Sequence, residues 1–199
     1  MKRVFDLLIS VPGLVIASPI LAVAAVAIKL ETPGPVFYRG TRVGLEGREF
    51  QILKLRSMRA GPARSGPAVT SGDDPRITSV GRFLRRTKFD ELPQLWNVIR
   101  GDMSLVGPRP EDPEFVKLYT PEQRRVLSVR PGITSPTSLA FRNEEAMLAD
   151  AGGAGAYAQD VMPRKLAMDL EYVDHRSFRG DLAILGRTAA LALTGWKRQ

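Results

Sequence analysis

The amino-terminal segment constrains the fold of this chain more than any other part of its sequence. Residues 4–28 are apolar apart from Asp6, Ser10 and Ser18. At the rise of an α-helix, a run of this length extends about 37 Å, which is enough to cross the hydrocarbon core of a bilayer. The sequence therefore predicts a membrane segment at the amino terminus.

Three interpretations of this segment compete. A cleaved signal peptide would use Lys2 and Arg3 as its basic region and residues 22–27 for cleavage, but the apolar run is long for such a leader. A simple spanning helix would place basic residues on both sides of the membrane, because Lys29 follows the run, and the positive-inside rule opposes that arrangement. A re-entrant hairpin would instead keep both basic flanks on one face.

The pair Ser18-Pro19 favours the hairpin, because it lies near the middle of the run. Proline lacks a backbone donor and clashes with the preceding turn, so a helix-break-helix is expected there. The hydroxyl of Ser18 would then bond to the carbonyl that proline leaves free. Proline kinks also occur in ordinary spanning helices, so the residues alone leave the spanning and re-entrant interpretations open.

The net charge of +8 is unevenly distributed. Residues 29–130 contain 19 Lys and Arg against 12 Asp and Glu, which gives +7 for this part alone. An anionic partner, such as phosphates or lipid headgroups, is expected to meet this part of the chain. Nucleic acid is not expected, because the sequence has no zinc-finger spacing and no RNA-binding aromatic motif.

Cysteine and histidine are nearly absent, which limits the possible cofactors. The chain has no cysteine and a single histidine, His175, so the usual zinc ligand sets cannot form. A metal, if one is used, is expected to be a hard cation such as Mg²⁺ on oxygen ligands. His175 is expected to be a surface or packing residue, because nothing near it suggests an acid–base pair.

Residues 87–97 contain the candidate catalytic groups. Asp90 and Glu91 directly follow a basic cluster of three arginines and Lys88, and they precede a predicted helix that Pro93 would help to start. A helix amino terminus favours negative charge, so both carboxylates are expected to be ionised. Ionised carboxylates beside several cations suit a nucleophile and a metal ligand acting on a phosphate. The alternative is a helix cap with surface salt bridges.

The remaining pattern predicts a mostly helical α+β fold of one domain. Two strands at residues 36–38 and 50–55, joined through glycines 44 and 47, form a small β-hairpin. Residues 60–76 are expected to form either a loop over the site or a plain surface loop. Residues 81–88 are expected to lie at the membrane interface, with their arginines against phosphates. The glycine run at 150–156 has no context for a dinucleotide loop.

The carboxy-terminal part is expected to add short helices. Residues 121–129 and 162–172 are predicted helices, and 181–196 is a third that either lies on the bilayer or packs on the core. The turn 107–110 holds Arg109 between Pro108 and Pro110, and such rigid presentation suits a bidentate contact to phosphate.

Taken together, these residues resemble the bacterial sugar transferases, the monotopic phosphoglycosyl transferases. The resemblance covers nearly the whole chain in order and rests on blocks at residues 54–58, 74–78, 81–85, 90–94, 101–110, 130–134 and 169–173. The length is similar to that of the minimal catalytic form of the family, with no additional transmembrane bundle in front.

The resemblance implies a reaction and a location. Such enzymes move a phosphosugar from a nucleotide diphosphate sugar, usually a UDP-sugar, to polyprenol phosphate at the cytoplasmic face of the bacterial inner membrane. The resemblance implies that Asp90 is the nucleophile, forming a covalent phosphosugar intermediate, and that Glu91 is a Mg²⁺ ligand. It also favours the re-entrant form of residues 1–29, with residues 30–199 as the membrane-associated catalytic part.

Other site residues are assigned by the same resemblance and by charge. Arg85 and Arg109, the latter with Pro108 and Pro110, are expected to bind substrate phosphates and the nucleotide. Lys54 and Arg56 are expected to line the site. Asp169 is expected to be a structural partner of an arginine, with support of the site as the alternative. The sugar, the glycan pathway and the oligomeric state cannot be read from the sequence.

The competing functional hypothesis is a non-enzymatic protein of the membrane surface. Its basic middle would bind anionic lipid in a salt-dependent manner, and the Asp90-Glu91 pair would serve only as a helix cap.

Overall fold

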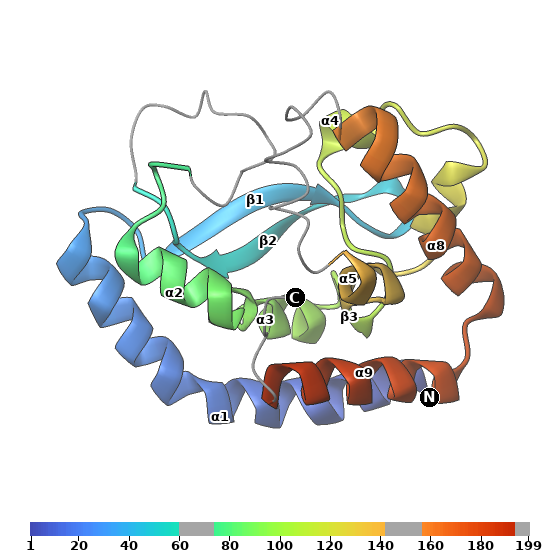
Figure 1. Cartoon of the computed structure of the whole chain (residues 1–199). Helices are drawn as coiled ribbons and strands as arrows, with labels where there is room; N and C mark the ends of the chain where they lie inside the picture. Colours follow the sequence, from blue (N-terminus) through green and yellow to red (C-terminus); the bar gives the residue numbers. More distant parts are fainter. Residues whose placement is uncertain (60–73, 142–156, 194–199) are drawn as a thin grey trace.

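The computed structural model describes residues 1–59, 74–141 and 157–193. It has the expected mostly helical α+β architecture with two small two-stranded sheets (Figure 1). The helices are α1 (Lys2–Glu31), α2 (Ser79–Thr87), α3 (Gln94–Arg100), α4 (Pro113–Val116), α5 (Pro136–Ala140), α8 (Met162–His175) and α9 (Phe178–Leu193). The strands are β1 (Phe37–Val43), β2 (Glu49–Leu55), β3 (Ser104–Val106) and β4 (Gly132–Thr134). Shorter helical turns are η1 (Leu45–Gly47), η2 (Phe89–Glu91), η3 (Gln123–Ser128) and the π-helical η4 (Tyr157–Val161).

The structure does not show the break that we expected at Ser18-Pro19. Helix α1 continues through both Pro12 and Pro19 and changes direction along its length instead (Figure 1). The hydroxyl of Ser18 donates to the carbonyl of Val15 at 2.7 Å. In an uninterrupted helix that carbonyl would accept the N–H of residue 19, which proline lacks. The back-bond expected for Ser18 is therefore present, and it satisfies the carbonyl without ending the helix.

The amino-terminal end of α1 is fastened to the globular part of the chain. Arg3 donates hydrogen bonds to the carbonyls of Val98 and Ile99 at the end of α3. The buried carboxylate of Asp6 accepts a hydrogen bond from the hydroxyl of Ser104 at 2.9 Å. Cleavage of a leader would remove these contacts and expose their partners, so the structure argues against the signal-peptide interpretation.

The carboxy-terminal end of α1 is fastened to the same globular part. The guanidinium of Arg56 donates to the carbonyls of Thr32 at 2.8 Å and Pro33 at 2.6 Å. Glu31 accepts the backbone N–H groups of Ser79 at 2.7 Å and Val80 at 3.1 Å, and so caps the start of α2. Both ends of the long helix are thus held by one body.

The predicted β-hairpin is confirmed. Strands β1 and β2 pair antiparallel from Phe37 opposite Leu55 to Val43 opposite Glu49. The turn contains η1, in which Gly47 has a φ of 78°, a conformation that glycine adopts without strain. The hairpin supplies Lys54 to the candidate site from the end of β2.

The parallel pair β3–β4 brings two sequence blocks into direct backbone contact. A Cβ at Gly107 would lie 2.4 Å from the carbonyl oxygen of Arg130, and a Cβ at Gly132 would lie 2.1 Å from the nitrogen of Gly107. The N–H of Gly132 donates to the carbonyl of Pro108 at 2.9 Å. Only glycine permits this approach, so these glycines fix the turn that presents Arg109.

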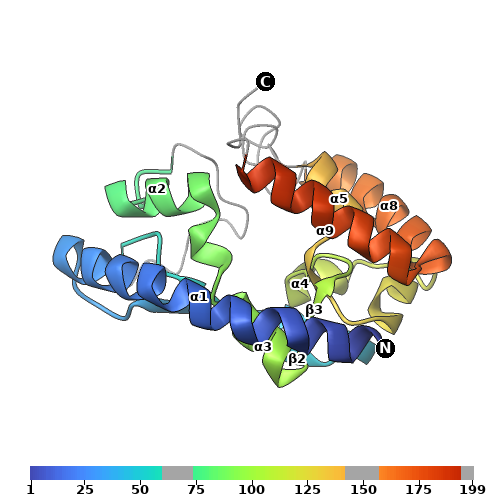
Figure 2. The same cartoon turned by 90° about the horizontal axis from the view of Figure 1, so that it is seen from below.

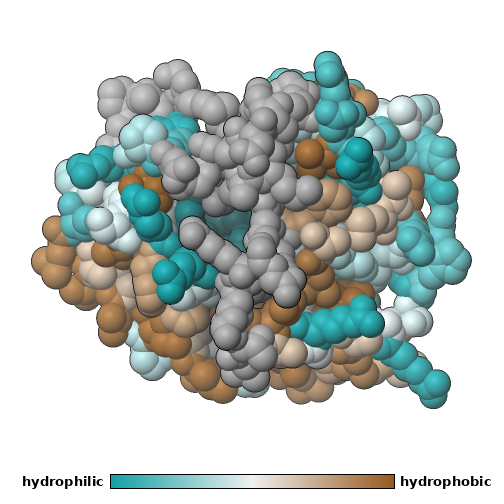
Figure 3. Space-filling model, in the orientation of Figure 1, coloured by the Kyte–Doolittle hydropathy of each residue, from teal (hydrophilic) through white to brown (hydrophobic). Residues whose placement is uncertain are grey.

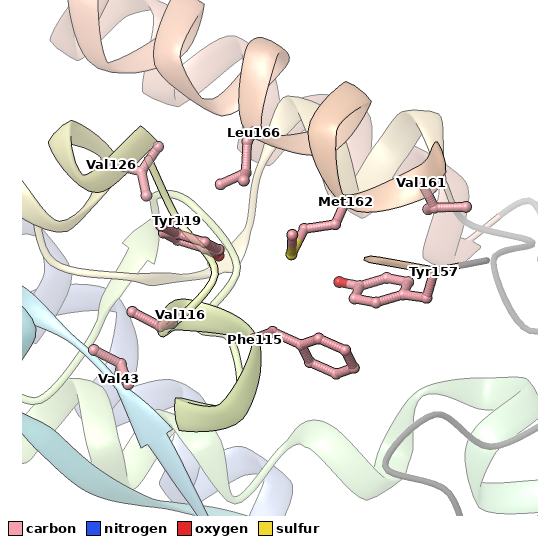
Figure 4. Packing of buried hydrophobic residues seen from close by; sticks show 9 residues of the cluster. All are labelled: Val43, Phe115, Val116, Tyr119, Val126, Tyr157, Val161, Met162 and Leu166. Atoms are coloured by element: carbon pink, nitrogen blue, oxygen red, sulfur yellow. The ribbon is translucent and has the colours of Figure 1, made fainter. Parts of the chain in front are cut away.

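Three groups of buried hydrophobic residues hold the elements together. One joins α1, β2 and α2 through Ala24, Ile28, Leu55 and Leu84, and a second joins β2, α3 and the segment before β3. The largest lies between α4, η3 and α8 (Figure 4). The candidate site lies among elements that the first two groups fix.

Helix α1 is long and apolar enough to cross a membrane, and most of it lies on the surface of the protein. Only 17% of its most apolar stretch is buried, and Ile16 and Val23 are 75% and 72% exposed. In Figure 3, hydrophobic residues gather along the lower edge of the molecule, where α1 runs in Figure 1. The start of α9 meets the amino-terminal end of α1, where the rings of Phe178 and Phe5 lie edge to face with their centroids 5.2 Å apart. A buried core helix would not expose so much apolar surface, so this face is suited to lipid.

Leu92, Leu95, Trp96 and Ile99 form an apolar stripe at helical spacing along α3 and the turn before it, but this stripe is not the buried face of the helix. Trp96 is 48% exposed, whereas Asn97 and Val98, outside the stripe, are buried. Leu95, which belongs to this stripe, lies against α1. A Cβ atom added at Gly13 of α1 would be 3.5 Å from Cδ1 of Leu95. The stripe therefore faces the membrane helix, and the opposite face of α3 packs on the hairpin.

Candidate active site

The two candidate carboxylates lie in a tight turn between two helices. Helix α2 ends at Thr87 and is followed by Lys88, whose φ of 59° is left-handed and turns the chain sharply. The next residues form η2, in which the N–H of Glu91 donates to the carbonyl of Lys88 at 3.1 Å. Asp90 and Glu91 therefore lie just before α3 begins, as the sequence predicted.

Glu91 is held by two cations from different elements. Its Oε1 accepts a hydrogen bond from Lys54 Nζ at 2.9 Å and another from Arg109 Nη2 at 2.9 Å. The side chains of Glu91, Lys54 and Arg109 are 12%, 23% and 33% exposed, so the cluster is largely shielded from water but still reachable. The structure thus brings together three of the residues predicted for the site.

This pairing fixes the charge state of Glu91. Burial alone would raise the pKa of its carboxyl, but the positive charges of Arg109 and Lys54 hold the pKa well below its usual range. Burial lowers the pKa of Lys54, and the nearby Glu91 opposes that shift. The expectation of an ionised Glu91 is supported, and its cause is the ion pairs more than the helix start.

Asp90 has a different environment from its neighbour. Its side chain is buried, and within the described part of the chain its Oδ1 has no hydrogen-bond partner. Burial and the negative charge of Glu91 raise the pKa of Asp90 to about 6, against the opposing charges of Lys54 and Lys88. Nearby cations thus stabilise the charge of an ionised Asp90 at neutral pH, while its Oδ1 accepts no hydrogen bond from the described residues, as suits a nucleophile.

Arg85 lies on the Asp90 side of the cluster. Its Nε donates to the hydroxyl of Ser57 at 3.0 Å, and its charge lowers the pKa of Asp90. Helix α2 can approach this close because Gly81 packs on the backbone of Ser57, where a Cβ would lie 2.0 Å from the carbonyl oxygen. Arg85 and Arg109 therefore flank the carboxylates from two different elements.

Arg56 is not brought to the carboxylates. It is buried, and its guanidinium is occupied by backbone carbonyls at the carboxy-terminal end of α1. Its contacts support a role in fastening the membrane helix and not in lining the site, which is where the sequence analysis placed it.

Pro108 and Pro110 hold Arg109 in place. Both prolines are buried, and the turn is anchored before Arg109 by the β3–β4 pair. After it, the carbonyl of Glu111 accepts the N–H of Val43 at 3.0 Å. The guanidinium is thus presented from a rigid turn, as the sequence predicted.

Among the described residues, no arginine pairs with Asp169, contrary to our expectation. It accepts a hydrogen bond from the hydroxyl of Thr137, and Lys165 is the cation that lowers its pKa. Burial of the Asp169 side chain outweighs these contacts and raises its pKa to about 6. His175 is exposed at the end of α8, as expected.

The sequence analysis missed three residues that position the site. Lys88 provides the left-handed turn, and Asn97 binds β2 through its amide, accepting from Leu53 N at 2.9 Å and donating to Gln51 O at 2.8 Å. Asp6 ties α1 to β3. A carboxylate inside an apolar run was the available signal for Asp6, because such groups are seldom left unpaired.

A magnesium ion fits this donor set in part. Among the described residues, no group of three or more Asp, Glu, His or Cys could hold a metal. Magnesium, however, is commonly bound through one or two carboxylates, with substrate phosphates and water completing the shell. Glu91 and the unpartnered Oδ1 of Asp90 supply such carboxylates.

The glycine run at 150–156 and most of the loop at 60–76 lie outside the described residues.

Comparison with known proteins connects this geometry to a family. The family model described as bacterial sugar transferase matches residues 1–195. The UDP-glucose:undecaprenyl-phosphate glucose-1-phosphate transferase of Caulobacter vibrioides is 42% identical over 97% of this chain and 70% of its own length. The exopolysaccharide production protein PSS of Rhizobium leguminosarum is 36% identical over 99% of this chain and 97% of its own.

A longer relative differs in its donor. The UDP-N-acetylgalactosamine-undecaprenyl-phosphate N-acetylgalactosaminephosphotransferase of Aeromonas hydrophila is 37% identical over 98% of this chain, which spans only 44% of that protein. The names of the Caulobacter and Aeromonas transferases thus share the acceptor and the UDP-linked donor, and they differ in the sugar.

Proposed function

Because this chain belongs to the bacterial sugar transferase family, we propose that it transfers sugar 1-phosphate from a UDP-sugar to undecaprenyl phosphate. The family match covers nearly the whole chain, and two relatives name this reaction for their own sugars. The observation that carries the mechanism is the contrast within one turn: Oε1 of Glu91 accepts hydrogen bonds from two cations, whereas the buried Oδ1 of Asp90 has no hydrogen-bond partner among the described residues.

The proposed first step uses Asp90 as the nucleophile. Its free carboxylate oxygen attacks the sugar-bearing phosphorus of the UDP-sugar, and a bond from that phosphorus to Asp90 forms. The bond between the phosphorus and the oxygen bridging to UMP breaks, and its electron pair leaves with UMP. Arg109 and Lys54 face the oxygens on which charge accumulates, and such placement lowers the barrier of phosphoryl transfer.

The proposed second step returns the enzyme to its starting state. A phosphate oxygen of undecaprenyl phosphate attacks the same phosphorus, and the bond to Asp90 breaks to restore the carboxylate. The product is undecaprenyl diphosphate sugar. Splitting one transfer into two displacements is the general advantage of a covalent intermediate.

Mg²⁺ is the proposed cofactor, with Glu91 as its ligand and Asp90 as a second available carboxylate. When bound, it would neutralise negative charge on the diphosphate of the donor. The protein itself positions the reacting groups. Arg109 and Lys54 orient Glu91 and the substrate phosphates, and the surrounding packing keeps bulk water from Asp90.

We also propose that α1 enters the membrane without crossing it, with the catalytic part on the cytoplasmic face. Arg3 and Asp6 at one end, and Glu31 at the other, bind the same globular body, which a spanning helix could not do. Basic residues at both ends agree with one cytoplasmic side. Single cysteines replacing Lys2 and Lys29 test this, because the chain has no cysteine of its own. Impermeant maleimide should label both from the cytoplasmic side, and labelling from opposite sides would contradict the proposal.

The reaction is tested by UMP release. Purified protein in nanodiscs receives Mg²⁺, undecaprenyl phosphate and each member of a panel of UDP-sugars, with Asp90→Asn as the control. UMP from the wild type alone would support the proposal and name the donor. No UMP across the panel, together with salt-dependent binding to anionic vesicles, would support the alternative of a non-enzymatic lipid-binding protein.

A further inference from the structure

The outer face of α2 carries a combination of residues that the proposed mechanism does not use. Arg82, Phe83 and Arg86 are exposed, Phe83 by 59%, whereas Leu84 on the inner face is buried. Leu84 packs with Ala24 and Ile28 of α1, so the helix has one face on the membrane segment and one face outward.

The position of α2 places this outer face beside the membrane surface. Figure 2 shows α2 beside the carboxy-terminal part of α1, where Val23 and Val26 are 72% and 59% exposed. The exposed ring of Phe83 lies on the face of α2 that does not pack on α1, and it meets the ring of Phe89 edge to face with the centroids 6.3 Å apart. An aromatic residue flanked by arginines on a short helix is typical of an element at the level of the headgroups.

The charges on this face are available to a ligand. Among the described residues, no carboxylate forms an ion pair with Arg82 or Arg86, and the nearby carboxylates of Glu91 and Asp74 are paired with other cations. The two arginines are four residues apart and so lie on the same side of the helix, one turn from each other. Two unpaired guanidinium groups beside an apolar ring match a phosphate attached to a hydrocarbon chain.

Arg85 connects this outer face to the nucleophile. It lies on the same helix within one turn of both exposed arginines, and it points inward to Ser57, from where its charge acts on Asp90. The arginines of α2 therefore lead from the membrane side to the reacting carboxylate. The other side of the carboxylates is occupied by Arg109 and Lys54.

We propose that Arg82, Phe83 and Arg86 form the docking site for the acceptor, binding the phosphate and the first isoprene unit of polyprenol phosphate. Arg85 then receives the phosphate next to Asp90. This proposal rests on the proposed function, and it divides the site into an acceptor side at α2 and a donor side at Arg109 and Lys54.

The experiment measures the two half-reactions separately and compares the double variant Arg82→Gln/Arg86→Gln with the wild type. Both proteins are held in nanodiscs that contain phosphatidylcholine as the only bilayer lipid. Stoichiometric UMP formation from the UDP-sugar without lipid acceptor measures the donor step. Steady-state turnover against undecaprenyl phosphate measures the acceptor step. Arg124→Gln is the matched control, because Arg124 is an exposed arginine in η3, which packs against α8 and not α2.

The expected result is a KM for undecaprenyl phosphate raised on the order of tenfold, since each basic group near an anionic lipid contributes a severalfold effect. UMP formation without acceptor should stay at the wild-type level, and Arg124→Gln should match the wild type throughout. An unchanged KM for undecaprenyl phosphate would overturn the proposal. If the double variant then also bound anionic vesicles less tightly than the wild type, the two arginines would bind lipids of the bilayer and not the acceptor. Lack of UMP from the wild type would overturn the proposed function itself and this proposal with it.

Discussion

Two buried clusters of charged residues lie in this protein, and they are built differently. The catalytic cluster surrounds Asp90 and Glu91 with Lys54, Arg85 and Arg109, so that cations outnumber carboxylates. Its central carboxylate, Asp90, keeps an oxygen without a hydrogen bond in the described chain. An excess of positive charge around an unpaired oxygen is an arrangement that an anionic substrate can complete.

The second cluster, which we call the α8 cluster, consists of Glu111, Thr137, Tyr157, Lys165 and Asp169. Here each carboxylate accepts from a hydroxyl: Thr137 donates to Asp169 and Tyr157 to Glu111, while Lys165 donates to Tyr157 at 3.0 Å. Carboxylates outnumber cations among its members. The cluster is complete without a ligand, so we assign it to the fold and the catalytic cluster to chemistry.

The sharpest test of this contrast is Asp90→Asn. Turnover should fall by at least about a thousandfold, because the nucleophile is lost. The thermal unfolding midpoint should hold or rise, since a buried carboxylate with a raised pKa is replaced by a neutral group. Initial rates of UMP release and thermal unfolding in detergent measure both effects, with the exposed Glu122→Gln as control. Residual turnover within tenfold of the wild type would contradict the assignment.

Glu91→Gln should damage both activity and stability. Lys54 and Arg109 would lose their shared partner and repel each other. Because both cations are partly exposed to water, we expect the free energy of unfolding to fall by about 1–3 kcal/mol. Activity should fall about a hundredfold or more. Denaturant unfolding and UMP release are the measurements. A variant as stable as the wild type would mean that the ion pairs do not hold the cluster together.

Asp169→Asn tests the α8 cluster through pH. The pKa of Asp169 is raised to about 6 from 3.8, so its contribution to stability is present below about pH 4 and is lost as pH rises through 6. Asparagine does not titrate. The stability of the variant relative to the wild type should therefore increase by about 1 kcal/mol between pH 5 and pH 7.5. If the stability difference between variant and wild type were the same at pH 5 and pH 7.5, this prediction would be wrong. Asp160→Asn, at an exposed position, is the control.

The smallest expected effect concerns Lys88, which turns the chain into the catalytic cluster. Its left-handed φ of 59° is strained for a residue with a side chain. Lys88→Gly should be more stable than Lys88→Ala by about 1 kcal/mol, because only glycine relieves the strain. Both variants should lose a similar, severalfold share of turnover, because both remove the charge near Asp90. Equal stabilities would show that the turn stores no strain.

The sequence predicted the parts of this architecture that local pattern controls. The hairpin, the turn around Arg109 and the position of Asp90 and Glu91 before α3 follow from glycine, proline and alternation, and they agree with the structure. The grouping of Lys54, Arg109 and Glu91 came from the family resemblance, since residues so far apart in sequence carry no local signal of contact.

The parts that sequence reasoning missed depend on contacts that the local pattern does not encode. The structure shows no break of the helix at Ser18-Pro19, where the hydroxyl of Ser18 satisfies the carbonyl that proline leaves without a donor. Arg56 looked like a site residue by charge alone, yet it binds the end of α1.

The central claim is that Asp90 carries the transferred group. Intact-protein mass spectrometry after incubation with a UDP-sugar and Mg²⁺, without lipid acceptor, tests it most directly. The account predicts a mass increase of one sugar phosphate on the peptide that contains Asp90, its loss when undecaprenyl phosphate is added, and no increase for Asp90→Asn. A mass increase in Asp90→Asn, or one located on another residue of the wild type, would contradict it.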